Sequence, residues 1–248
     1  MKVGVFDSGV GGLTVVKSLL EHQLFEQIIY FGDTARVPYG SKDKNTIIRY
    51  GIEAVEFFKN FDLDLIIVAC NSVSAYALEE MQESASCPVV GVVEAGVLAT
   101  RNALKDTSKH ILILGTKATI ASKAYEDGLR VLEYNNLTPL ATPLFVPIVE
   151  EDISDGVLDA TLHHYFHTLT HTPDAIILGC THFPLIAHAI QKYFPNNPTL
   201  IHSGDAIVQY LQEQFSFTRK FDNTQTQFFA SENPDALKLT AKRWLYEN

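Results

Sequence analysis

Two cysteines stand in matching sequence contexts, and a pair of thiols placed this way could carry out proton-transfer chemistry. Cys70 ends the apolar run at 65–69 and is followed by short polar residues that suit the start of a helix. Cys180 ends a second apolar run, at 176–179, in the same manner, 180 − 70 = 110 residues later. N–H groups at a helix start stabilise a thiolate, so each cysteine could accept and release a proton near neutral pH.

Two other sequence echoes have nearly the same spacing. The Val-Pro pair at 37–38 returns at 146–147, an offset of 146 − 37 = 109 residues. Ser8, which follows an apolar run, is echoed by Thr116, an offset of 116 − 8 = 108 residues. A common order at a nearly constant offset predicts a duplicated α/β unit. Two units related by a pseudo-two-fold axis would bring both cysteines to face each other across a cleft.

Short apolar runs alternate with amphipathic segments along the chain, which is typical of parallel α/β sheets. We expect strands at 3–6, 28–31, 65–69, 89–93, 111–114, 144–149, 175–178 and up to 201, with a possible edge strand at 228–229. We expect helices at 13–20, 46–58, 75–83, 125–132, 158–169, 185–193, 206–214 and 236–245. In such folds ligands bind beyond the carboxyl ends of the strands.

The composition excludes several classes of protein. The chain has 248 residues, of which 46% are hydrophobic, and a formal net charge of −10. Without a basic run, it is not expected to bind nucleic acid. Without a long apolar run or a signal peptide, it is expected to be cytoplasmic and independent of a membrane. Three cysteines are too few for a disulfide scaffold, and Cys87, which lacks a counterpart, is interpreted as structural.

Polar side chains gather where the expected strands end, and none of them is Lys or Arg. An anionic ligand would therefore be held by hydroxyls and backbone N–H groups. Asp7 is favoured as functional, whereas Glu150 and His182 could equally be structural. The candidate residues are Asp7, Ser8, Tyr39, Cys70, Asn71, Ser72, Thr116, Thr119, Glu150, Cys180, Thr181 and His182.

Racemisation is the reaction that best explains two opposed thiols, because it needs a base on one face of a carbon and an acid on the other. No sequence feature marks any lysine as the one that would carry a pyridoxal cofactor. A cofactor-independent racemase or epimerase is therefore the leading interpretation. The glycine-rich turn at 9–12 matches neither a dinucleotide fingerprint nor a P-loop. Three alternatives stay open: a zinc site of Cys70, Cys180 and His182, a thiol hydrolase using Cys180 and His182, and a non-catalytic binding protein.

The same residues resemble the glutamate racemases, bacterial enzymes of the cofactor-independent aspartate/glutamate racemase family. The matching stretches lie in the family's order between residue 1 and about residue 205, and together they are highly specific. They are the stretches at 4–12, 33–40, 68–71, 115–119 and 178–185.

The resemblance implies a role for each candidate residue. Cys70 would take the α-proton from D-glutamate and Cys180 that from L-glutamate, with no cofactor and no metal. Asp7 and His182 would assist Cys70 and Cys180 respectively, and Glu150 would be a further assisting carboxylate. The product would supply D-glutamate for peptidoglycan, and a racemase of the same superfamily acting on aspartate or another amino acid is the alternative. The implied substrate contacts are Asp7, Ser8, Tyr39, Gly40, Asn71, Ser72, Thr116, Thr119 and Thr181.

The resemblance also implies two similar α/β domains, 1–92 plus 206–248 and 93–205, with the substrate between them and a homodimer as the assembly. Two departures from the family pattern stand out: Ser72 replaces the usual Thr, and Ala95 replaces the Pro of a common Glu-Pro-Gly link. Family members activated by a UDP-linked cell-wall precursor carry an N-terminal extension. This sequence shows no extension of that kind before the matching stretch at 4–12, so we expect no activation by the precursor. An assay with and without the precursor would test this expectation.

Overall fold

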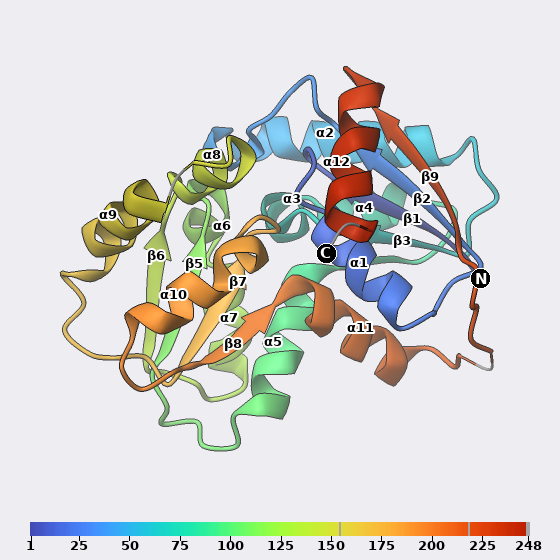
Figure 1. Ribbon diagram of the computed structural model, residues 1–248. Helices are drawn as coiled ribbons and strands as arrows, with labels where there is room; N and C mark the ends of the chain where they lie inside the picture. The colour runs from blue at the N-terminus through green and yellow to red at the C-terminus, as the bar shows by residue number, and fades with distance from the viewer. Residues whose placement is uncertain (154, 218, 247–248) are drawn as a thin grey trace.

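The computed structural model describes residues 1–153, 155–217 and 219–246, and its backbone is built on two parallel β-sheets (Figure 1). Every strand of the first sheet pairs in parallel with its neighbours. The last strand, β9, lies at an edge, which confirms the edge strand predicted around 228–229. In spatial order the strands are β4 (Val89–Gly91), β3 (Leu65–Val68), β1 (Lys2–Asp7), β2 (Gln27–Gly32) and β9 (Gln225–Ala230).

The second sheet is also parallel and repeats the order of the first. When β5 to β8 are matched in chain order with β1 to β4, both sheets read second strand, first, third, fourth. The predicted fold class, two similar parallel-sheet α/β units, is therefore confirmed. In spatial order the strands are β6 (Leu137–Ala141), β5 (Ile111–Gly115), β7 (Ala175–Gly179) and β8 (Thr199–His202).

The sequence echoes fall at equivalent places in the two units. The Val-Pro pairs at 37–38 and 146–147 each follow the second strand of their unit. Cys70 and Cys180 each follow the third strand. The spacing of about 110 residues is thus the repeat of the fold itself, and both thiols lie beyond the carboxyl end of a central strand.

Helices cover both faces of each sheet. The first unit carries α1 (Leu13–Glu21), η1 (Tyr39–Ser41), α2 (Lys44–Phe58), α3 (Asn71–Tyr76), α4 (Leu78–Ser84) and α12 (Pro234–Tyr246). The second sheet is accompanied by α5 (Val92–Ala103), α6 (Lys117–Ser122), α7 (Ala124–Val131), α8 (Phe145–Glu150), α9 (Asp155–Phe166), η2 (Phe183–Ile186) and α10 (Ala187–Tyr193). α11 (Ser203–Gln214) follows β8 and packs between α5 and α1 of the first unit.

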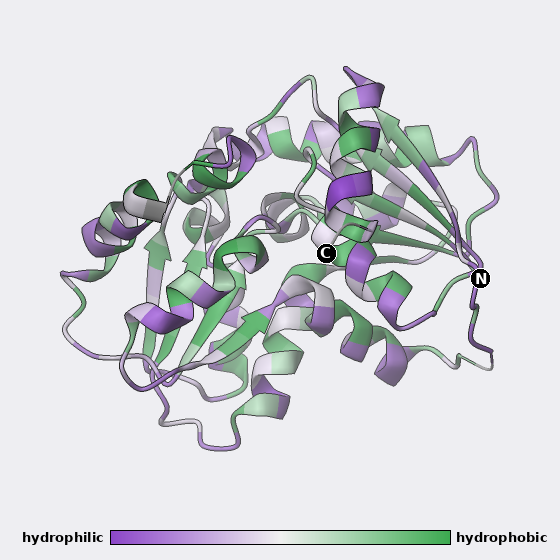
Figure 2. Ribbon diagram, in the orientation of Figure 1, coloured by the Kyte–Doolittle hydropathy of each residue, from purple (hydrophilic) through white to green (hydrophobic). Residues whose placement is uncertain are grey.

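The strands of both sheets are largely hydrophobic (Figure 2). Alternate residues of each strand enter different cores, as expected for a sheet buried on both faces. Val3 and Val5 of β1 pack in the core beneath α1 and α11, whereas Phe6 packs in the core beneath α2. The first of these cores also includes Ile113 of β5. One continuous hydrophobic cluster therefore reaches both sheets, while Leu112 of β5 belongs to a separate core with α8 and α9.

The strand predicted at 89–93 is too long. β4 ends at Gly91, and α5 begins at Val92. The hydroxyl of Ser74 accepts a hydrogen bond of 3.1 Å from the N–H of Val93, and this satisfies a donor in the first turn of α5. Tertiary capping therefore overrides the β propensity of this valine run.

The strand predicted at 144–149 is wrong, because this segment is the helix α8. Phe145, Ile148 and Val149 are buried at the i, i+3, i+4 spacing of a helix, and Pro147 is tolerated because it lies in the first turn. Glu150 therefore ends a helix and not a strand. The strand itself, β6, lies earlier and was missed: it contains Pro139, which an edge strand accepts.

The helix predicted at 75–83 is in fact two short helices, α3 and α4, which meet at Ala77. α3 begins at Asn71, so Cys70 itself occupies the N-cap position. The thiol is thus closer to a helix start than the sequence pattern placed it.

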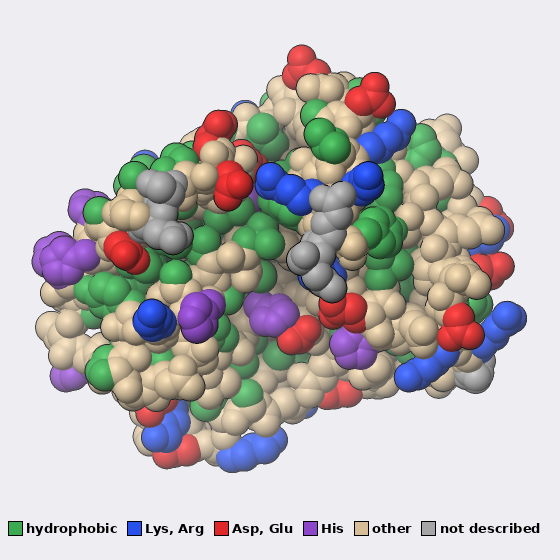
Figure 3. All heavy atoms as spheres, in the orientation of Figure 1, with side chains coloured by type: hydrophobic (Ala, Val, Ile, Leu, Met, Phe, Trp, Pro, Cys, Tyr) green, Lys and Arg blue, Asp and Glu red, His purple; other side chains and the backbone are tan. Residues whose placement is uncertain are grey.

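None of the helices described is long and apolar enough to cross a membrane. On the face of the molecule shown in Figure 3, acidic and basic side chains are interspersed.

Candidate active site

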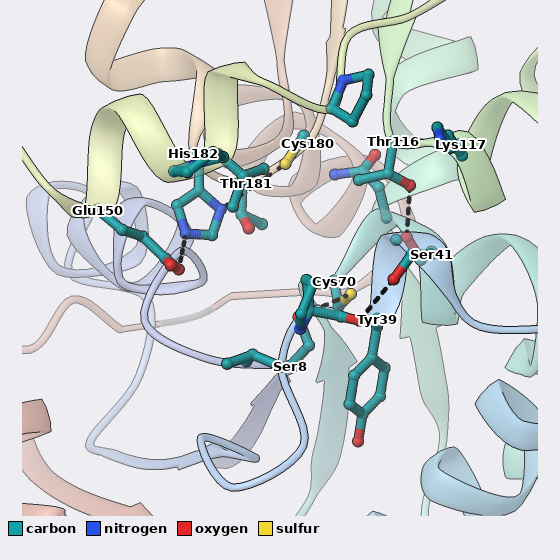
Figure 4. A pocket seen from close by; sticks show the side chains of 18 residues that line it. Ser8, Tyr39, Ser41, Cys70, Thr116, Lys117, Glu150, Cys180, Thr181 and His182 are labelled. Carbon is teal, nitrogen blue, oxygen red and sulfur yellow. Dashed lines mark hydrogen bonds and ion pairs between the residues drawn. The ribbon is translucent and has the colours of Figure 1, made fainter. Parts of the chain in front are cut away.

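A cavity of about 370 Å³ lies beyond the carboxyl ends of the strands, and residues of both units line it (Figure 4). Both predicted thiols reach it, and their sulfur atoms point toward the same space. The candidate residues that line the cavity are Ser8, Tyr39, Gly40, Cys70, Asn71, Ser72, Thr116, Glu150, Cys180, Thr181 and His182.

Cys70 is held as a buried thiol. Its Sγ donates a hydrogen bond of 3.5 Å to Oγ of Ser8, and the side chain is 6% exposed. Burial and, to a smaller extent, the negative charge of Asp7 together raise the pKa of this thiol to about 12. Cys70 is therefore protonated at neutral pH.

Cys180 lies in a different electrostatic environment, because a histidine and a carboxylate line up behind it. Nδ1 of His182 is 3.7 Å from Sγ of Cys180, and Nε2 is 2.8 Å from Oε1 of Glu150. Burial opposes the charged ring, but hydrogen bonds to the thiol and to the carboxylate outweigh it and raise the pKa of His182 to about 10. An imidazolium ion can donate from both nitrogens, one toward the sulfur of Cys180 and one toward the carboxylate of Glu150.

Asp7 lies behind the wall of the cavity and does not line it. It is fully buried, and its carboxylate accepts a hydrogen bond of 2.9 Å from the N–H of Gly9 and one of 3.2 Å from Oγ1 of Thr181. Burial raises the pKa of this carboxyl, although the nearby His182 partly opposes the shift. Asp7 therefore joins the turns that follow β1 and β7.

Three hydroxyls form a cluster where the units meet. Oγ of Ser72 lies 2.8 Å from Oγ1 of Thr116 and 3.3 Å from Oγ1 of Thr119, and the two threonine oxygens are 3.0 Å apart. Thr116 also caps α6 by accepting from the N–H of Thr119. Ser72 and Thr116 reach the cavity, whereas Thr119 is buried behind them. The hydroxyl of Ser72 therefore bridges α3 and α6.

The polar groups of Tyr39 and Asn71 are already engaged elsewhere. The Tyr39 hydroxyl donates to Oδ2 of Asp33 and points away from the cavity (Figure 4). Oδ1 of Asn71 accepts from the Tyr125 hydroxyl at 2.7 Å, and its Nδ2 donates to Oγ of Ser203 at 3.1 Å. A ligand would therefore meet the ring or backbone of Tyr39 and the backbone of Asn71 more readily than these groups.

The sequence of this chain matches a known protein family. Residues 14–211 match the family model described as Asp/Glu/Hydantoin racemase. The chain belongs to the Asp/Glu/hydantoin racemase family. Within it, the chain is 63% identical over 246 residues to a glutamate racemase of Nitratiruptor, an alignment that covers 99% of this chain and 96% of that protein.

Solved structures of this racemase family have the same fold. The glutamate racemase of Campylobacter jejuni superposes with a TM-score of 0.97 at 53% identity, over 99% of this chain and 98% of that one. The glutamate racemase of Francisella tularensis in complex with D-glutamate superposes with a TM-score of 0.84 at 32% identity, over 98% of this chain and 93% of that one.

Several residues that line the racemase cavity were absent from the sequence-based set. Ser41 and Lys117 are polar; Lys117, exposed at the first position of α6, corrects the expectation that no Lys or Arg borders the site. The others are apolar, and the echoed Val-Pro pairs were the signal that could have found four of them. They are Val37, Pro38, Pro143, Val146 and Pro147.

The zinc hypothesis gains no support from the geometry. Among the residues that the structure describes, no three His, Cys, Asp or Glu side chains are arranged to hold a metal ion. Cys70, Cys180 and His182 border one cavity, but His182 is already bonded to Cys180 on one nitrogen and to Glu150 on the other.

Proposed function

We propose that this racemase interconverts L- and D-glutamate by a two-base mechanism that needs no cofactor. The observation that carries the proposal is the placement of Cys70 and Cys180 after equivalent strands of two repeated units, with both thiols on one cavity. Such a pair can serve one carbon from opposite faces.

The unequal thiols suggest how a turnover from L-glutamate begins. The thiolate of Cys180, beside the charged His182, removes the α-proton, and the electron pair stays on the α-carbon. The thiol of Cys70 then delivers its proton to the opposite face and becomes the thiolate. D-glutamate leaves, Cys180 holds the proton it removed, and the two residues have exchanged roles.

The return direction must start from a Cys70 thiolate, which burial and the charge of Asp7 disfavour. Asp7 assists Cys70 in this proposal, but its negative charge raises the pKa of the thiol. Asp7 can therefore help only by carrying a proton or by being protonated itself, and burial, which raises its own pKa, favours the protonated form. Ser8, the hydrogen-bond partner of Cys70, would stabilise the thiolate once formed.

The carboxylates of glutamate would be held mainly by neutral donors. The lining residues that carry hydroxyls and backbone N–H groups for this purpose are Ser8, Tyr39, Gly40, Asn71, Ser72, Thr116 and Thr181. Glutamate is preferred to aspartate because the similar proteins over the full chain are glutamate racemases, one of them solved with D-glutamate. Asp7 and Thr119, predicted as contacts, would act behind these residues.

The wider role follows the substrate. We propose that the enzyme is a cytoplasmic homodimer that supplies D-glutamate for peptidoglycan. We also propose that its domains are residues 1–92 plus 206–248 and residues 93–205. The pairing of β9 with β2 supports the return of the chain to the first domain.

Polarimetry and two variants test this function. The purified protein, without added cofactor, should abolish the optical rotation of L-glutamate and act on L-aspartate much more slowly. Cys70→Ser and Cys180→Ser should each lose racemisation by at least about 1,000-fold, as expected when a reacting acid–base group is removed. A Cys70→Ser protein that still racemises glutamate would contradict the two-thiol mechanism. No racemisation by the native protein would favour the alternatives, a thiol hydrolase that uses Cys180 and His182 or a binding protein.

A further inference from the structure

The segment that follows β1 in the first unit is hydrogen-bonded to the turn that carries Cys180 in the second unit. Oγ1 of Thr14, at the start of α1, donates a hydrogen bond of 2.9 Å to the carbonyl oxygen of Thr181. The side chain of Thr181 in turn donates to Asp7. Between them lies Gly11, where an added Cβ would be 2.3 Å from Oγ1 of Thr181 and 2.6 Å from the ring of His182. The two turns are therefore in direct contact.

The carbonyl of Thr181 depends on Thr14. Thr181 is buried at 4% exposure, and in the described part of the chain no other hydrogen bond reaches this oxygen. The Thr14 hydroxyl is also 2.9 Å from the carbonyl of Gly11, but that oxygen already accepts the backbone N–H of Thr14. The hydroxyl proton is thus needed at Thr181, because a buried acceptor without a donor is costly.

We propose that Thr14 is a positioning residue for Cys180: its hydroxyl fixes the turn at 180–182 against the first unit, so that the second thiol meets the substrate carbon opposite Cys70. Thr14 does not line the cavity. Its effect is therefore on the placement of a reacting group and not on ligand contacts. This inference rests on the proposed racemisation.

Thr14→Val removes the hydroxyl but keeps the size and β-branching of the side chain. We expect kcat to fall on the order of 10-fold, because a displaced acid–base group slows proton transfer, while KM changes by less than about 2-fold. Thr14→Ser restores the donor and should recover most of kcat.

The matched control is Thr161→Val. The Thr161 hydroxyl is also buried and bonded to a carbonyl, that of Val157 at 2.8 Å, but both residues lie within α9, away from the cavity. This variant should keep the kinetic constants of the native enzyme. Thermal unfolding of all variants shows whether each is folded under assay conditions.

A second measurement separates a misplaced Cys180 from a damaged protein. In heavy water, D-glutamate is deprotonated by Cys70 first, so a slow Cys180 leaves time for Cys70 to exchange its proton and return deuterium to the same face. The ratio of α-deuterated D-glutamate to newly formed L-glutamate should therefore rise severalfold in Thr14→Val. It should stay at the native value in Thr14→Ser and Thr161→Val.

The outcomes distinguish this inference from the proposed function. If the native protein does not racemise glutamate, the function itself is wrong. If the native protein is active and Thr14→Val keeps both kcat and the deuterium ratio, the positioning role of Thr14 is overturned. A fall in kcat with an unchanged ratio also contradicts it, because the loss would then not lie at Cys180.

Discussion

In the proposed mechanism, the chemistry depends on two identical side chains in unequal surroundings. Cys70 meets a hydroxyl and a buried carboxylate, whereas Cys180 meets an imidazole backed by Glu150. Repetition of the fold placed the thiols symmetrically, but the residues behind them differ. The two thiols therefore face different hydrogen-bond partners and different neighbouring charges.

The charge of His182 should make stability depend on pH. Its pKa is about 10 in the folded protein, above the value of about 6.5 expected for an unfolded chain. The stabilisation that results from this raised pKa is present in full below about pH 6.5 and is lost as the pH rises toward about 10. The melting temperature of the native protein should exceed that of His182→Asn at pH 6, and the gap should narrow steadily up to pH 10. A gap that is constant with pH would contradict the charged state of this ring.

Glu150 should account for part of that charge. Glu150→Gln keeps a hydrogen-bond acceptor beside Nε2 but removes the negative charge, so the pKa of His182 should fall by about one unit, equivalent to about 1.4 kcal/mol. Titration of the His182 Cε1 proton by NMR measures the shift, with His182→Asn to assign the signal. Glu151→Gln, at the exposed neighbouring position, is the control and should leave the titration unchanged.

At the scale of elements, contact between η1 and α6 should set the width of the cavity. A Cβ on Gly40 would lie 2.5 Å from Cβ of Thr116, so Gly40→Ala must push these elements apart. We expect KM for glutamate to rise on the order of 10-fold, with a loss of about 1–3 kcal/mol in the free energy of unfolding.

Gly156→Ala is the matched control for that prediction. No heavy atom lies within 4 Å of an added Cβ, and the position is in α9, where alanine is the better helix former. Stability should rise by up to about 1 kcal/mol with unchanged kinetics. Equal KM values for Gly40→Ala and the native enzyme would show that the packing of η1 does not shape the site.

Buried strands were predictable from the sequence where they form an apolar run between turn residues, as β1, β3, β5 and β7 do. Prediction failed where tertiary context decides the outcome. The valines at 92–93 have strand propensity, but Ser74 caps them as a helix. β6 is half-exposed and contains Pro139, so it lacks the usual strand pattern.

The candidate site was predictable to the extent that it lies at strand ends. Cys70 and Cys180 were found this way, because a parallel sheet gathers its carboxyl ends at one edge. Lys117 and Pro143 were missed, since no local pattern shows that they border a cavity shared with the other unit. The burial of Asp7 behind the wall, and the engagement of the Tyr39 hydroxyl by Asp33, depend on contacts that spacing does not encode.

At the scale of the whole molecule, a ligand in this cavity touches both units and should stabilise the protein against unfolding. At 100 times its dissociation constant, glutamate should add about 2.7 kcal/mol to the free energy of unfolding. The double variant Cys70→Ser/Cys180→Ser keeps the enantiomer fixed during a thermal scan. L-aspartate at the same concentration should shift the melting temperature less, and an equal shift would move the substrate assignment away from glutamate.

The most direct test of the two-base account is the exchange of the α-proton with solvent. The native protein would be incubated with L-glutamate in heavy water without added cofactor, while optical rotation and the α-proton signal are followed. The account predicts that optical rotation is lost and that the D-glutamate formed carries deuterium at the α-carbon. The reason is that the second thiol has exchanged with the solvent and delivers a deuteron. Racemisation in which the original proton is retained in the product would contradict two opposed thiols, and no exchange with any amino acid would contradict racemisation altogether.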